Sequence, residues 1–128
     1  MSNPISNYLG VHAAALPLRE QRMQLIASNL SNADTPNFKA KDLDFQAALE
    51  HAAARAAPLQ TTHEQHLTLL DASPRVFERA GVQPSLDGNT VDADTERAAY
   101  GRAALEYRAS LSFIESKVRT MLTAITGQ

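Results

Sequence analysis

The residues best suited to metal chemistry are two histidines, His63 and His66, which lie three positions apart with Glu64 between them. A metalloprotease helix carries its histidines four positions apart and adds a third ligand. Here the spacing differs, the flanking residues do not predict a helix, and no pattern brings His12 or His51 nearby. Ordinary surface histidines are the preferred interpretation, and a metal hydrolase is the least favoured alternative. We predict no metal and no cofactor.

An acidic string between residues 87 and 96 resembles a set of calcium ligands. Its members are Asp87, Asn89, Asp92, Asp94 and Glu96. The string lacks the glycine at the sixth position and the terminal glutamate of an EF-hand loop. A turn followed by the capped start of a helix explains every one of these residues.

Other signatures of catalysis or nucleic-acid binding are missing from the sequence. It holds no cysteine, no G-x-S-x-G motif and no glycine-rich phosphate loop. The formal charge is −2, and no basic cluster exceeds the pair Lys39 and Lys41. Without a basic groove, the aromatic residues of the C-terminal segment do not predict base stacking. We therefore predict neither an enzyme nor a partner of nucleic acid.

The elements that would position these residues are clearest near the C-terminus. Eight residues follow at alternating spacings of four and three, which predicts a long helix with a heptad seam. They are Tyr100, Ala104, Tyr107, Leu111, Ile114, Val118, Met121 and Ile125. Asp92 is the expected N-cap, and Gly127 is the expected stop.

A second long helix is predicted between Ile5 and Ala33. Its seam repeats every seven residues and consists of Leu9, Leu16, Met23 and Leu30. Leu18 and Leu25 lie on another side, so this helix carries apolar groups on two faces, whereas an isolated domain needs only one. We expect Pro17 to kink the helix or to mark its restart. The two seams together are the predicted assembly surface.

The middle of the chain predicts shorter elements. Residues 28–41 are rich in Asn, Asp, Ser, Thr and Pro, which build turns. Asp44–Ala57 predicts a short alanine-rich helix, and Pro58–Leu86 predicts loops with one or two short strands. The expected fold class is mainly α. Residues 1–33 and 91–128 pair as an antiparallel coiled-coil hairpin, and residues 34–90 form an irregular connection that can carry a short helix and minor β structure.

The apolar content also bears on how the chain is stabilised. Of its 128 residues, only 28 are Leu, Ile, Val or Phe, which leaves little for a large core. Burial along one seam does not offset the entropy lost in ordering a helix of that length, so we expect assembly to order the ends. No stretch is long and apolar enough to span a membrane. The Tyr8–Leu18 stretch lacks a preceding basic residue, so a cleaved signal peptide is not expected.

Two short motifs carry a family resemblance. The residues Ser28-Asn29-Leu30-Ser31-Asn32-Ala33-Asp34-Thr35-Pro36-Asn37-Phe38-Lys39-Ala40 resemble the N-terminal signature of the bacterial flagellar axial rod protein family. The stretch Ser85-Leu86-Asp87-Gly88-Asn89-Thr90-Val91-Asp92 is similar to the signature that precedes the last helix in the family's proximal rod branch. By this resemblance, Asn29, Asn32, Thr35, Pro36, Asn37 and Phe38 shape the turn that leaves the first helix. Asp87, Gly88, Asn89, Thr90, Val91 and Asp92 shape the turn that enters the last helix. The family's usual turn glycine is Asn37 here.

The resemblance implies a structural subunit of the flagellar proximal rod, which assembles through its terminal helices into the basal-body axial structure. Implied partners are other rod proteins, the basal-body rod adaptor, the flagellar type III export apparatus and copies of the chain itself. It implies a place in the periplasmic part of the basal body, reached without a cleaved signal peptide and without membrane insertion. The alternative is a soluble coiled-coil adaptor or secretion chaperone that does not polymerise. That class shares the heptads but not the paired turn motifs.

Overall fold

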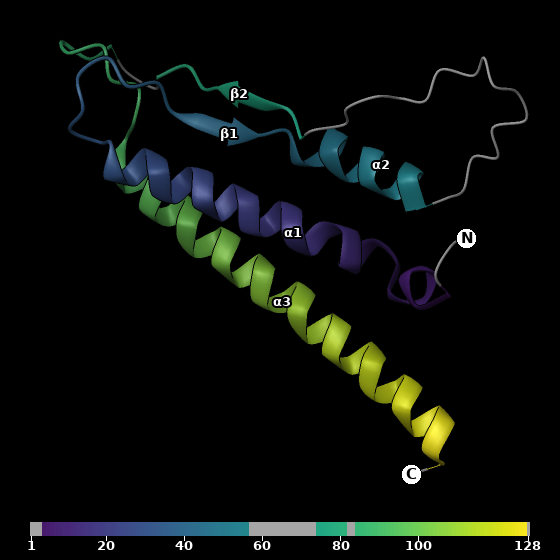
Figure 1. Ribbon diagram of the computed structural model, residues 1–128. Helices are drawn as coiled ribbons and strands as arrows, with labels where there is room; N and C mark the ends of the chain where they lie inside the picture. Colours follow the sequence, from purple (N-terminus) through teal and green to yellow (C-terminus); the bar gives the residue numbers. More distant parts are fainter. Residues whose placement is uncertain (1–3, 57–73, 82–83, 128) are drawn as a thin grey trace, which may run out of the picture.

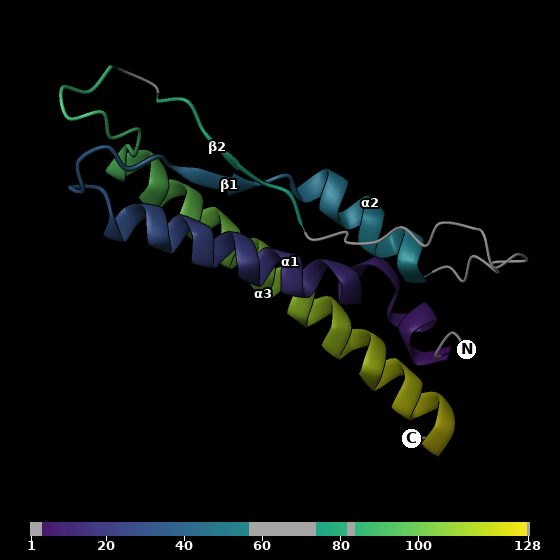
Figure 2. The same cartoon turned by 45° about the horizontal axis from the view of Figure 1, so that its top comes forward.

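Two long antiparallel helices dominate the structure, a computed structural model that describes residues 4–56, 74–81 and 84–127 (Figure 1). The elements in chain order are α1 (Pro4–Ser31), β1 (Lys41–Leu43), α2 (Phe45–Ala56), β2 (Val76–Glu78) and α3 (Ala93–Thr126). Helix α3 lies along one side of α1, and the small sheet with α2 lies along another (Figures 1 and 2). The predicted mainly α hairpin, with a short helix and minor β structure in the middle, is confirmed.

Helix α3 begins and ends where its sequence predicts. The Asp92 side chain accepts hydrogen bonds from the backbone amides of Asp94 and Thr95, at 3.0 and 3.2 Å. The bond from Thr95 is the main reason that the pKa of the Asp92 carboxyl lies below its ordinary value of 3.8. At the other end, Gly127 takes a left-handed conformation with φ 71°, and its amide donates to the Thr123 carbonyl.

Helix α1 bends at a different residue from the one predicted. Pro17 lies inside the helix, whereas the non-helical backbone is at Gly10, with φ 59° and ψ −144°. The expected kink or restart at Pro17 is therefore wrong. A proline in a helix removes one hydrogen bond, and Pro17 lies on an exposed side of α1, where solvent can reach the backbone. Gly10 has no Cβ, so it adopts a positive φ at little steric cost.

The small core lies between α1 and the layer formed by the sheet and α2. Leu18, Leu43 and Ala48 are buried together, with Leu25 and Phe45 packed against them. The strands pair antiparallel, and their register places Asp42 of β1 opposite Phe77 of β2. This layer covers the second apolar side of α1 that the sequence predicted. The histidine pair His63 and His66 lies outside the described residues.

Candidate assembly site: the α1–α3 contact line, its open face and a polar junction

Helices α1 and α3 contact each other in a constant register. The ring of His12 stacks on Phe113 at 4.7 Å, Arg19 forms an ion pair with Glu106 at 2.6 Å, and Asn29 donates to Glu96 at 3.1 Å. From one pair to the next, the residue number rises along α1 by the same amount as it falls along α3. The same register places three further pairs opposite each other: Ala15 with Ser110, Arg22 with Ala103, and Ile26 with Ala99. We call these six pairs the contact line.

Small and polar side chains make up most of the contact line. Ala15, Ala103 and Ser110 are buried, and so is the carboxylate of Glu96. Small residues let two helices approach closely, and the ion pair and amide contact fix their register. The contact line was not predicted because it repeats with the same period as the predicted seam and its residues are less apolar than those of the seam.

The predicted seam lies beside the contact line rather than on it. Each seam residue stands one position after a residue of the contact line or of its continuation, a rotation of about 100° around the helix. None of the twelve seam residues is fully buried. Tyr100, Leu111 and Val118 are 40%, 37% and 40% exposed, and Ile125 is 75% exposed. The expected coiled-coil pairing is present, but the seam is not what holds α1 to α3.

The seams of the two helices face the same side of the hairpin. In antiparallel helices, a one-residue advance on each rotates both side chains toward the same side. Leu18 and Leu25 stand one position before the contact-line residues Arg19 and Ile26, and they face the sheet and α2. The seam residues therefore lie on the opposite side, where no described element covers them. We call this the open face; its members are Leu16, Met23 and Leu30 of α1 and Tyr100, Ala104, Tyr107, Leu111, Ile114 and Val118 of α3.

A buried polar junction closes the end of the hairpin where α1 stops and α3 starts. Asn29 is 1% exposed, and its amide donates to the Lys41 carbonyl at 2.8 Å and to Glu96. Its carbonyl oxygen accepts from the Lys41 amide at 2.9 Å. One side chain of α1 thus binds both β1 and α3, which explains its position in the first family motif.

The ion pair of Glu96 with Arg79 attaches the second strand to this junction. Glu96 is 2% exposed, and its two oxygens accept separately from Arg79 and from Asn29. The Arg79 amide also donates to the Ala40 carbonyl at 2.7 Å, next to the β1–β2 pairing. A buried carboxylate is tolerated when it is paired and hydrogen bonded in this way.

Asn89 joins the second motif to the end of α1. Its side-chain amide donates toward the carbonyls of Asn32, Ala33 and Thr35, at 2.9, 2.8 and 2.9 Å. Its own carbonyl oxygen accepts from the Val91 amide at 2.8 Å. The first of these carbonyls belongs to the residue directly after α1, which ends at Ser31, and the other two belong to the turn that follows, where the helix supplies no donors. Asn89 therefore caps one helix from the loop that leads into the other.

The two motif turns also contact each other through Asn37 and Gly88. Asn37 takes the left-handed conformation, with φ 60°, so it adopts the backbone for which the family's usual residue is glycine. Its amide donates to the Asp87 carbonyl at 2.9 Å. Gly88 has φ 74°, and a Cβ placed there would lie 2.5 Å from the Asn37 side-chain oxygen. Only glycine fits this close approach without a shift.

The remaining motif residues hold the turn after α1 from within. The Asn32 amide donates to the Ser28 carbonyl at 2.8 Å, and the Thr35 hydroxyl donates to the Asn32 side chain at 3.2 Å. The Thr90 amide donates to the Phe38 carbonyl at 3.0 Å. Pro36 is exposed and follows Thr35 in the turn.

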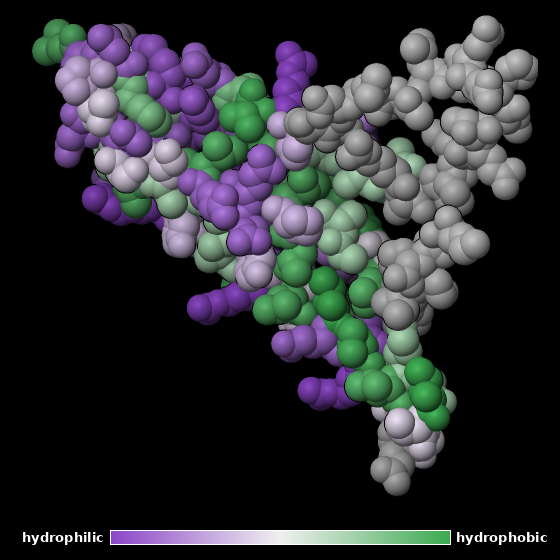
Figure 3. Space-filling model, in the orientation of Figure 1, coloured by the Kyte–Doolittle hydropathy of each residue, from purple (hydrophilic) through white to green (hydrophobic). Residues whose placement is uncertain are grey.

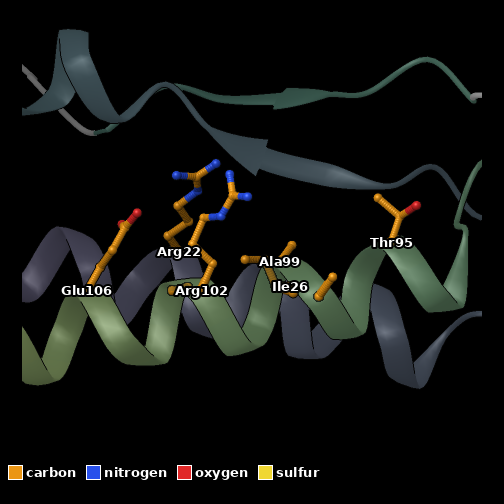
Figure 4. A pocket seen from close by; sticks show the side chains of 8 residues that line it. Arg22, Ile26, Thr95, Ala99, Arg102 and Glu106 are labelled. Carbon is orange, nitrogen blue, oxygen red and sulfur yellow. The ribbon is translucent and has the colours of Figure 1, made fainter.

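A shallow groove lies between α1 and α3 on the side of the sheet (Figure 4). Ile26 and Ala103 are among the residues that line it. The guanidinium groups of Arg22 and Arg102 extend toward β1. Arg22 binds both carboxylate oxygens of Asp42, at 3.0 and 3.2 Å. Among residues 4–56, 74–81 and 84–127, no group of three or more side chains is arranged to hold a metal.

Comparison with known proteins agrees with the paired motifs. A family model described as flagella basal body rod protein matches residues 9–39, which include most of α1 and the turn after it. The flagellar basal body rod protein FlgB of Aeromonas hydrophila is 43% identical over 122 residues, covering 93% of this chain and 92% of that protein. The chain belongs to the FlgB family. FlgB of Cereibacter sphaeroides is 40% identical over 122 residues, covering 94% of each chain. FlgB of Escherichia coli K12 is 38% identical over 120 residues, covering 87% of each.

As a member of the FlgB family, the chain is a structural subunit of the flagellar basal body rod. None of the helices in the described part of the chain combines the length and apolar content needed to cross a membrane. Sequence reasoning identified the asparagines of both FlgB turns but missed the Lys41 backbone that Asn29 binds and the ion pair of Arg79 with Glu96. No local pattern marks this ion pair, because Arg79 and Glu96 are 17 residues apart and belong to separate parts of the fold. They meet only in the folded chain.

Proposed function

We propose that this FlgB family member has no catalytic role and builds the proximal rod by packing its open face against neighbouring subunits. The proposal rests on one observation: the large apolar residues of the seams lie on the side of the α1–α3 hairpin opposite the sheet and α2. The sheet and α2 cover one side of the hairpin, while the opposite side presents two aligned rows of apolar side chains. A monomer gains little from such a face, whereas a neighbouring helix that packs on it buries both rows at once.

The far end of α3 supports the same proposal. Leu122 and Ile125 are 55% and 75% exposed, and they lie beyond Phe113, the last residue of α3 in the contact line. Figure 3 shows apolar residues gathered at this projecting end of the molecule. Exposed apolar groups on a projecting helix favour contact with neighbouring subunits.

The proposed partners follow from membership of the FlgB family and from this face. They are copies of the chain, other rod proteins, the basal-body rod adaptor and, during export, the flagellar type III export apparatus. The proposed location is the periplasmic part of the basal body, reached without a cleaved signal peptide. Residues 1–33 and 91–128 would form the core of the rod, and residues 34–90 the connection outside it.

A charge placed on the open face tests the proposal. Leu111→Asp puts a carboxylate where a neighbour would bury it, so we expect loss of motility and loss of rods from isolated basal bodies. The isolated protein should keep its helical content, because Leu111 is 37% exposed before assembly. Ser112→Asp is the matched control, since Ser112 is exposed on α3 outside the open face. Normal rods in the Leu111→Asp strain would refute the role given to this face.

A further inference from the structure

The groove between α1 and α3 contains an arginine whose charge is not paired. Its charged lining residues are Arg22, Arg102 and Glu106. Arg22 binds the Asp42 carboxylate at 3.0 and 3.2 Å, and Glu106 binds Arg19 at 2.6 Å. Arg102 is exposed and forms no ion pair with any residue of the described ranges. The groove therefore has an uncompensated positive charge.

The groove has room for a side chain from another subunit. Its volume is about 310 Å³, and Ala98, Ala99 and Ala103 form much of its α3 wall. Figure 4 shows the side chain of Arg102 extending from α3 toward β1. Leu105, three residues further along the same side of α3, is 70% exposed. A guanidinium beside small and apolar residues fits a carboxylate that stands on an apolar surface.

The open face of the hairpin includes a carboxylate with the opposite charge. Glu20 stands one position after Arg19 of the contact line, so it lies on the same side as Leu16 and Met23. The register places it across from Tyr107. Glu20 is exposed and has no ion-pair partner in the described part of the chain. A neighbour that covers the open face removes water from this carboxylate, which then requires a cation.

We propose that the groove of one copy receives Glu20 from the open face of a neighbouring copy, so that Glu20 and Arg102 form an ion pair between chains. This inference rests on the assembly role proposed for the open face. The two charges are opposite, and they lie on opposite sides of one hairpin, because Arg102 stands one position before Ala103 of the contact line. Complementary surfaces on opposite sides of a subunit make a head-to-tail contact, which repeats into a ring or a filament. The occupant that fits is therefore a second copy of the chain.

Charge reversal tests the pairing. Glu20→Arg and Arg102→Glu each place like charges at the contact, so each should lower the number of rods in isolated basal bodies by about tenfold or more. The double variant Glu20→Arg/Arg102→Glu should restore the rods, because it rebuilds the pair with its charges exchanged. Both residues are exposed before assembly, so the isolated variants should keep their helical content. Arg108→Glu is the matched control, since Arg108 is exposed on α3 outside both surfaces. It should leave rods normal and should not rescue Glu20→Arg.

Cysteine cross-linking locates the contact, because the chain has no cysteine of its own. Glu20→Cys and Arg102→Cys face opposite sides of the hairpin, so a disulfide between them joins two chains. In isolated basal bodies this double variant should give dimers and longer oligomers without reducing agent. Glu20→Cys combined with Arg108→Cys should not.

Three results would overturn the pairing: no recovery of rods in the double reversal, no cross-link in intact basal bodies, or cross-links from Arg102→Cys to a different protein. The last result would make that protein the occupant of the groove. If Leu111→Asp removes rods while both single reversals leave them normal, the open face keeps its assembly role and only the Glu20–Arg102 contact is refuted.

Discussion

Replacing Asn89 by alanine tests whether the two motif turns act as one unit. The side-chain amide has two hydrogens, which serve three carbonyls within 2.9 Å, and its oxygen accepts from the Val91 amide. The variant therefore loses two donated hydrogen bonds and one accepted hydrogen bond at a buried position, since Asn89 is 6% exposed. At about 1 kcal/mol for each bond, and with some carbonyls regaining water, the expected loss of unfolding free energy is about 2–3 kcal/mol.

The assay is urea unfolding of the isolated protein, followed by far-ultraviolet circular dichroism. For a chain of this size, a loss of about 2–3 kcal/mol lowers the midpoint by about 1–2 M urea. Gln24→Ala is the control, because it removes an exposed amide from the same helix that Asn89 caps, and it should change stability by less than about 0.5 kcal/mol.

Asn89→Asp separates the donated bonds from the accepted one. Aspartate keeps an oxygen for the Val91 amide but directs a carboxylate at three carbonyl oxygens. We therefore expect it to be at least as unstable as the alanine variant at neutral pH. If Asn89→Ala shifted the midpoint no more than the Gln24→Ala control, or if Asn89→Asp matched the unmodified protein, the capping role of Asn89 would be refuted.

Three further predictions concern the same junction. Glu96→Gln leaves the Arg79 guanidinium without its buried carboxylate, so it should cost about 2–4 kcal/mol in urea unfolding, and Arg79→Met should recover part of that loss in the double variant. Gly88→Ala combines a positive φ with a contact of 2.5 Å to the Asn37 side chain, so its unfolding midpoint should fall by an amount equivalent to about 1–3 kcal/mol. The pKa of Asp92 is lowered by folding, so its contribution to stability is present above pH 3.8 and is lost as the pH falls through the folded-state pKa. Asp92→Asn should therefore flatten the acid limb of a helicity titration, and an unchanged acid limb would count against this cap.

Local signals in the sequence determined the helices and their ends. The Asp92 cap and the Gly127 stop use bonds between residues that are close in sequence, so a short segment holds all the needed information. The positive φ of Asn37 likewise follows from a turn motif in which a residue tolerant of that conformation is required. Heptad spacing also predicted two long paired helices, although the stripe that pairs them lies beside the seam that carried the prediction.

Tertiary structure alone decided which stripe faces which partner. The contact line and the open face share one period and differ by a rotation of about 100°, so spacing cannot tell them apart. The burial of Leu18 by the sheet and α2 fixes that rotation, and it leaves Leu111 and its neighbours facing outward. Only the structure shows that the bend lies at Gly10 instead of Pro17, because both residue types weaken a helix and no local rule chooses between them. The charges of Glu96 and Arg79 meet only after the chain has folded, because no local rule pairs residues of separate elements.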